Sequence, residues 1–155
     1  MLISKLNYNF KFKIKKTINN FFEINLSDSD CVGMEVSTLN DNIIIATRNG
    51  YGKKTKVSEF RITKRGSKGV KALNITEKNG PLVAFKIIEE DQDLMIITNS
   101  GIIIRLPLNQ ISQLGRVTQG VRLINLKDNQ VVSTISIVNK EETEEIEEEM
   151  IIKED

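Results

Sequence analysis

Histidine and tryptophan are absent from this chain of 155 residues, and Cys31 is its single cysteine. Without histidine the chain cannot form a Ser-His-Asp or Cys-His triad and has no imidazole to act as a base. It also lacks the imidazole that is the commonest metal ligand. A single cysteine excludes an intramolecular disulfide and a cysteine-based metal cluster. No apolar run approaches the roughly 20 residues of a membrane span, and no signal peptide is visible. The sequence therefore predicts a cytoplasmic protein with no cofactor, no metal site, no catalytic residue and no membrane partner.

Charge is divided unevenly along the chain, although 22 basic and 21 acidic residues leave a net charge of only +1. The residues after Val138 include nine acidic and two basic side chains, a net charge of −7, so residues 1–138 carry +8. Residues 140–155 form an acidic tail without a sustained apolar face, and we expect the tail to be disordered. The basic body and the acidic tail need separate explanations.

A repeat of 51 residues organises the basic body. Residues 42–75 align without a gap with residues 93–126, with seven identities in 34 positions. Two identities, Gly50/Gly101 and Gly69/Gly120, mark turns. Each unit has four runs typical of strands, at 43–47, 53–57, 70–75 and 82–88 and again at 94–98, 102–106, 121–126 and 131–138. Only 57–60 and its copy 108–111 fit a helical turn.

Four strands in about 50 residues are typical of a propeller-like blade. We therefore expect an all-β fold of blades, each with about four antiparallel strands that pair in one sheet. Residues 24–28 match 124–128, so the sequence predicts two blades plus a partial one. The blades span residues 22–139, with units at about 42–92 and 93–138, whereas residues 1–21 match neither unit. Because about three repeats are usually needed for stability, we expect further blades in an assembly or a longer array.

The stretch from Arg48 to Lys71 contains nine basic residues against one acid, Glu59. Basic side chains at turns and strand ends can neutralise DNA phosphates without reading the sequence, whereas the alternative is an ordinary solvated surface. Within this stretch, the Gly66 and Gly69 positions allow close approach to a phosphate. Gly120, the copy of Gly69, favours a simple turn, and the two interpretations are compatible. The P-loop-like run 50–55 lacks the required first glycine, so nucleotide binding is disfavoured.

Residues 22–139 resemble the C-terminal DNA-wrapping domain of the bacterial DNA gyrase A protein. The resemblance lies in Asn49-Gly50-Tyr51-Gly52-Lys53-Lys54-Thr55, Glu59-Phe60-Arg61 and Arg65-Gly66-Ser67-Lys68-Gly69-Val70, and it returns in Ser100-Gly101 and Gly115-Arg116-Val117-Thr118-Gln119-Gly120-Val121-Arg122. It implies a β-pinwheel that wraps duplex DNA around a basic perimeter and supports negative supercoiling by a type II topoisomerase, an isomerase. The chain is shorter than the six blades of that family, so we expect a fragment with two blades.

The resemblance also implies the gyrase A and B proteins, or further blades, as partners. Neither Tyr8 nor Tyr51 lies in a context like the family's cleavage site, so no catalytic role follows. We predict that the basic residues of the blades contact DNA: Arg48, Lys53, Lys54, Lys56, Arg61, Lys64, Arg65, Lys68, Lys71, Arg105, Arg116 and Arg122. The alternative is a scaffold module that docks on other blades or on the gyrase proteins without binding DNA. The acidic tail either solubilises the chain or competes with DNA for the basic surface.

Overall fold

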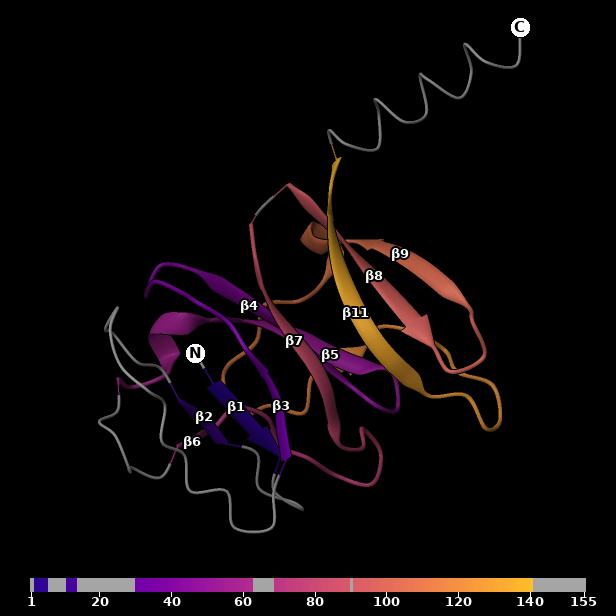
Figure 1. Cartoon of the computed structure of the whole chain (residues 1–155), viewed down its shortest axis with the longest axis horizontal. Helices are drawn as coiled ribbons and strands as arrows, with labels where there is room; N and C mark the ends of the chain where they lie inside the picture. Colours follow the sequence, from indigo (N-terminus) through magenta and orange to yellow (C-terminus); the bar gives the residue numbers. More distant parts are fainter. Residues whose placement is uncertain (1, 6–10, 14–29, 63–68, 90, 141–155) are drawn as a thin grey trace, which may run out of the picture.

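The computed structural model describes residues 2–5, 11–13, 30–62, 69–89 and 91–140 (Figure 1). Its strands are β1 (Leu2–Lys5), β2 (Lys11–Lys13), β3 (Asp30–Met34), β4 (Asn42–Thr47), β5 (Tyr51–Lys56), β6 (Val70–Lys71), β7 (Leu82–Ile88), β8 (Gln92–Thr98), β9 (Ile103–Pro107), β10 (Val121–Arg122) and β11 (Val132–Asn139). Two short 3-10 helices, η1 (Val57–Glu59) and η2 (Leu108–Gln110), occupy the two predicted helical turns. No helix among these residues is long and apolar enough to cross a membrane.

The strands form three antiparallel sheets, which confirms the all-β prediction. Their strand orders are β3-β1-β2-β6, β10-β5-β4-β7 and β11-β8-β9. Figure 1 shows the three sheets one after another, with β7, the edge strand of the second sheet, beside β11, the edge strand of the third. The predicted strands of both units are present, although the third strand of each unit is only two residues long.

The third strand of each unit does not pair within its own unit, contrary to our expectation. In the second unit β10 pairs with β5 of the first unit, through Val121 opposite Gly52 and Arg122 opposite Tyr51. In the first unit β6 pairs with β2, through Val70 opposite Phe12. The second sheet therefore contains three strands of the first unit and the third strand of the second unit, and the first sheet contains β1, β2 and β3 with the third strand of the first unit.

The N-terminal strands take positions that sequence comparison does not reveal. Residues 1–21 match neither repeat unit, yet β1 and β2 hold the two central positions of the first sheet, as β4 and β5 do in the second. The repeat is visible in the sequence mainly through its turn glycines. Strand pairing, in contrast, needs only backbone hydrogen bonds and side chains that suit a β-strand. A hairpin without the Asn-Gly or Ser-Gly turn therefore escapes the comparison.

Strand β4 separates two hydrophobic clusters. Ile43 and Ile45 pack in one cluster with Val57 and Phe60, whereas Ile44 and Ala46 pack on the opposite face. Because successive side chains of a strand point to opposite faces, this double burial explains the unbroken apolar run of β4. The second cluster contains Leu108 and Ile111, the counterparts of Val57 and Phe60, so each 3-10 helix anchors its segment in a core.

We predict that Gly50→Ala destabilises the protein more than Gly101→Ala. Both glycines have φ of +79°, so alanine costs about 1–2 kcal/mol at either position. A Cβ at Gly50 would lie 2.8 Å from Ile124 Cγ2 and 2.9 Å from the Ile124 carbonyl oxygen, whereas a Cβ at Gly101 meets nothing within 4 Å. This clash should add about 1–3 kcal/mol. Urea unfolding of the two variants measures the difference, and equal losses would contradict the contact between Gly50 and the second unit.

Candidate nucleic-acid interface

The segment that joins the second and third strands of a unit crosses from one sheet to the preceding one, and we call it the crossover. In the second unit the crossover spans residues 108–120. It begins with η2, and its Ile111 is buried in the core. The Lys54 N–H donates to the Ser112 carbonyl oxygen (3.1 Å), and the Leu114 N–H donates to the Lys54 carbonyl oxygen (2.9 Å). Residues 112–114 of the crossover are therefore already hydrogen-bonded to the edge of β5, and β10 pairs with the same edge further along the chain.

Lys53 holds the crossover from within the protein. Its side chain is fully buried, at 0% exposure. The ammonium Nζ donates to four oxygen atoms: the carbonyls of Gly115 (2.8 Å), Arg116 (2.7 Å) and Thr118 (3.3 Å) and the Thr118 hydroxyl (3.2 Å). Burial lowers the pKa of Lys53 to about 8; the Glu59 carboxylate opposes this shift and the Arg116 guanidinium adds to it. The carbonyls of Gly115 and Thr118 also accept from the N–H groups of Thr118 and Asn74, whereas the Arg116 carbonyl takes its hydrogen bond from the Lys53 ammonium.

Three further contacts complete the attachment of the crossover. The Thr55 hydroxyl donates to the Leu114 carbonyl oxygen (2.8 Å). Asn79 Nδ2 donates to the carbonyl oxygen of Gln119 (3.1 Å). Glu59 Oε2 accepts a hydrogen bond from the Arg116 N–H (2.7 Å). These donors and acceptors come from the first unit, so the first unit fixes the backbone of the second unit's crossover.

The structure divides the predicted DNA-contacting residues into exposed and engaged side chains. The exposed ones are Arg48, Lys56, Arg61, Arg105 and Arg122. Arg105 is nevertheless paired with the buried Asp93 through Nε and Oδ2 at 2.6 Å. Lys64, Arg65 and Lys68 lie outside the described residues. Of the predicted set, Arg48, Lys56, Arg61 and Arg122 are thus exposed.

Three residues of the predicted DNA-contacting set make hydrogen bonds within the protein. Lys53 is buried, and we therefore leave it out of the DNA-contacting set. Arg116 Nη1 donates to the Lys71 carbonyl oxygen. Lys71 Nζ donates to Asn74 Oδ1 (2.8 Å). Because these donors are already used inside the protein, a phosphate would have to compete with existing hydrogen bonds at each of them.

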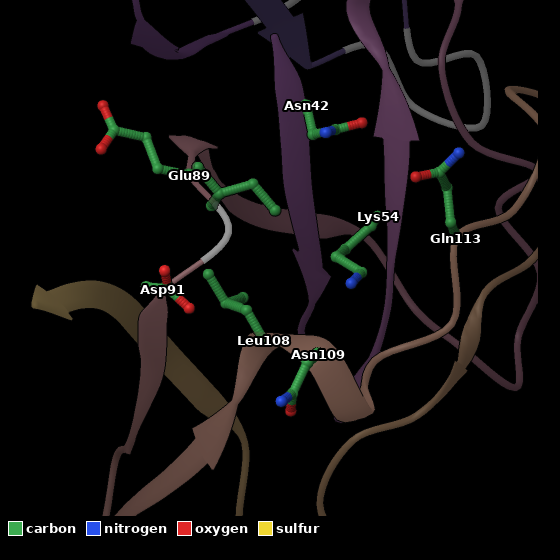
Figure 2. A pocket seen from close by; sticks show the side chains of 8 residues that line it. Asn42, Lys54, Glu89, Asp91, Leu108, Asn109 and Gln113 are labelled. Atoms are coloured by element: carbon green, nitrogen blue, oxygen red, sulfur yellow. The ribbon is translucent and has the colours of Figure 1, made fainter. Parts of the chain in front are cut away.

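Lys54 lines a polar pocket of about 340 Å³ where the first unit meets η2. Figure 2 shows its side chain pointing into the pocket, with Glu89 and Asp91 on one side and Asn109 below. Two carboxylates against one ammonium repel an anion. This pocket is therefore a poor place for a phosphate. Within the described ranges, no group of three or more His, Cys, Asp or Glu side chains is placed to hold a metal ion.

One basic residue beside the interface is missing from the predicted set. Lys78 Nζ lies 5.7 Å from the centre of the Tyr51 ring, and Arg122 Cζ lies 5.6 Å from it. The three residues are far apart in sequence, and Arg122 reaches the other two because β10 pairs with β5. Sequence position alone gives no signal for Lys78, since it stands outside the dense basic stretch.

These features define a class: propeller-like β-blades that exchange their third strands and carry cations on turns and crossovers. The chain belongs to the family of the DNA gyrase C-terminal domain, beta-propeller, which it matches over residues 41–89 and 92–139. It is 48% identical to the DNA gyrase A protein of Staphylococcus epidermidis over 122 residues, which are 77% of this chain and 14% of that protein. The chain thus spans about a seventh of the length of this relative.

Two solved structures share the fold. A DNA gyrase A C-terminal domain matches with a TM-score of 0.59 and 25% identity, over 63% of this chain and 33% of that chain. The C-terminal domain of DNA topoisomerase IV matches with a TM-score of 0.67 and 22% identity, over 76% of this chain and 37% of that chain. The similarity to the second structure shows the fold alone.

We predict that Lys53→Met destabilises the protein by about 2–4 kcal/mol, because it removes the charge-assisted hydrogen bonds of a buried ammonium and leaves the Arg116 carbonyl without its donor. Lys54→Met is the matched control: Lys54 is the adjacent lysine, lies half-buried at the pocket and should change stability by no more than about 0.5 kcal/mol. Chemical denaturation measures both. Equal effects of the two substitutions would contradict the role assigned to Lys53.

The stability difference between the wild type and Lys53→Met should also depend on pH. The pKa of Lys53 is about 8 in the folded protein and about 10.4 in an unfolded chain. Between these values the unfolded state binds more protons, so the free energy of unfolding of the wild type rises with pH. The variant lacks this titration, so the gap between the two should widen from pH 7 to pH 10. A constant gap would show that Lys53 has an ordinary pKa.

Proposed function

We propose that this chain is a non-catalytic DNA-binding module of a type II DNA topoisomerase and acts as part of the DNA gyrase A protein. The observation that carries the proposal is the presence of exposed cations, Arg48, Lys56, Arg61 and Arg122, on the turns and paired strands of the blades. Side chains on a fixed scaffold can neutralise phosphates of a bent duplex with little further ordering. Lys64, Arg65 and Lys68 remain part of the predicted DNA-contacting set.

In this function the blades guide duplex DNA around their perimeter and support negative supercoiling. The partners are duplex DNA and the gyrase A and B proteins, in the bacterial cytoplasm. Strand cleavage and ATP hydrolysis belong to other parts of that assembly. This chain contributes the positive charge that binds the duplex and the scaffold that positions it. Contacts to phosphates bind DNA without sequence preference, as a wrapping surface requires.

A second candidate function, docking on further blades without DNA, is favoured by the outer edge of β9. In the preceding sheet the corresponding edge of β5 is covered by β10. Among the described residues no strand pairs with the outer edge of β9, and Ile102 and Ile103 are 42% and 54% exposed there. An unpaired edge with apolar side chains accepts another strand readily. The occupant in this candidate is the third strand of a further repeat unit.

A titration of duplex DNA at several salt concentrations separates the two functions. If about four phosphates are neutralised, affinity should fall roughly 100-fold between 50 and 200 mM salt, because counterions are released on binding. Docking alone predicts little DNA binding at any salt concentration. Undetectable binding at 50 mM salt, or an affinity independent of salt, would contradict the DNA-binding function.

A further inference from the structure

A second surface pocket, of about 280 Å³, lies where β10 crosses the turn end of the first unit. We call it the inter-blade pocket, and its polar lining comes from Asn49, Tyr51, Lys78, Arg122 and Asn125. Asn49, Tyr51 and Lys78 belong to the first unit, whereas Arg122 and Asn125 belong to the second. Strand exchange therefore assembles this pocket, and neither unit has it alone.

Hydrogen bonds fix the orientation of Arg122. Its Nε and Nη2 donate to the Tyr51 hydroxyl at 3.3 and 3.0 Å, and its Nη1 donates to Asn125 Oδ1 at 3.2 Å. These bonds use three of the five N–H groups of the guanidinium and leave two for a ligand. The hydrogen bond from Arg122 lowers the pKa of Tyr51, burial opposes this shift, and the charges of Arg122 and Lys78 add to it. The pocket is thus a positively charged environment.

The loop that carries Lys78 is also held in place. Asn49 Nδ2 donates to the carbonyl oxygens of Glu77 (3.0 Å) and Lys78 (3.2 Å), and the Asn49 N–H donates to the Asn79 carbonyl oxygen (3.2 Å). The ammonium of Lys78 lies on the Tyr51 ring, 5.7 Å from its centre. Two cations thus lie near one aromatic ring, and the ring attracts both.

The two pockets between the first and second units differ in the sign of their charge. The pocket at Lys54 contains two carboxylates and one ammonium. The inter-blade pocket is lined by a guanidinium and an ammonium with no carboxylate. An oriented guanidinium beside a lysine suits a phosphate group, which accepts several charge-assisted hydrogen bonds. The pocket that favours an anion is therefore the one at the turn end of the first unit.

We propose that the inter-blade pocket binds a backbone phosphate of duplex DNA through Lys78 and Arg122, with Tyr51 as a positioning residue for Arg122. This inference rests on the proposed function and names one place where the duplex touches the blades. The second unit has Ile102 and Asn129 at the positions of Tyr51 and Lys78, so it does not repeat the site. Strand exchange between the two units thus creates a contact that the repeat pattern does not contain.

The test compares Lys78→Gln/Arg122→Gln with Lys86→Gln/Lys127→Gln, which removes the same charge from two residues outside the pocket. At 0.1 M salt the first pair should weaken duplex binding about tenfold, and its plot of log affinity against log salt should be less steep by about 0.9 for the one phosphate lost. The second pair should change affinity less than about twofold. Equal losses in both pairs would mean that net charge alone matters, and would overturn the proposal.

Tyr51→Phe separates positioning from charge. It keeps the ring and both cations but removes the acceptor that orients the guanidinium. Affinity should fall about threefold while the salt dependence keeps its slope, because the same phosphate is still neutralised. An affinity equal to that of the wild type would remove Tyr51 from the site.

Inorganic phosphate tests the pocket independently of DNA. In nuclear magnetic resonance titrations of the whole chain, shifts should gather at residues 49, 51, 78, 122 and 125, and Lys78→Gln/Arg122→Gln should abolish them. If the wild type binds no duplex at any salt concentration, the proposed function fails and the phosphate titration alone decides the pocket. Shifts spread evenly over all exposed cations, or no shifts, would overturn the pocket.

Discussion

The pairing of β10 with β5 is the constraint on which the rest of the structure depends. Two residues of each strand face each other, Val121 with Gly52 and Arg122 with Tyr51. This short ladder commits the crossover of the second unit to the edge of the first sheet and brings Leu123 and Ile124 against the shared core. It also places Arg122 beside Tyr51. The units are therefore interlocked, and one unit without its neighbour lacks both an edge strand and part of its core.

A ladder of two residues is too short to fix the crossover by itself, and buried polar contacts supply the remainder. The ammonium of Lys53 binds three carbonyl groups and one hydroxyl, and Thr55, Glu59 and Asn79 bind the peptide groups on either side. A satisfied network of this kind specifies one backbone path, because any other path leaves buried groups unpaired. Apolar packing alone would tolerate several positions of the segment. The polar network thus fixes the backbone of the crossover and, with it, the positions of the crossover's exposed side chains.

Local features of the sequence predict the strands, the two 3-10 helices and the family, whereas the partners of the third strands could not be predicted. Turn glycines such as Gly50 and Gly101 and β-branched runs are local signals. The partner of β10 lies about 70 residues away, and its backbone pairing carries no residue code. The burial of Lys53 has a weak signal: it faces Ile45 across the strand pair, on the same side as Tyr51 and Thr55. Alternation along β5 separates these inward positions from Lys54 and Lys56. Because lysine is rarely buried, however, sequence analysis still predicts an exposed side chain at Lys53.

The distribution of charge, and not its total, connects this fold to a nucleic acid. Among the described basic side chains, those of Lys53 and Arg116 donate to backbone carbonyl groups, and that of Lys71 donates to the Asn74 side chain. Lys54 stands among carboxylates. Positive charge remains available at the exposed Arg48, Lys56 and Arg61. It is also available at the turn end, where strand exchange adds Arg122 to Tyr51 and Lys78. A phosphate is attracted by the local field within about a Debye length of roughly 10 Å, so distant acids of the chain matter less than these neighbours. Near-neutral total charge is thus compatible with a surface that binds a polyanion, provided that the fold keeps the two signs apart.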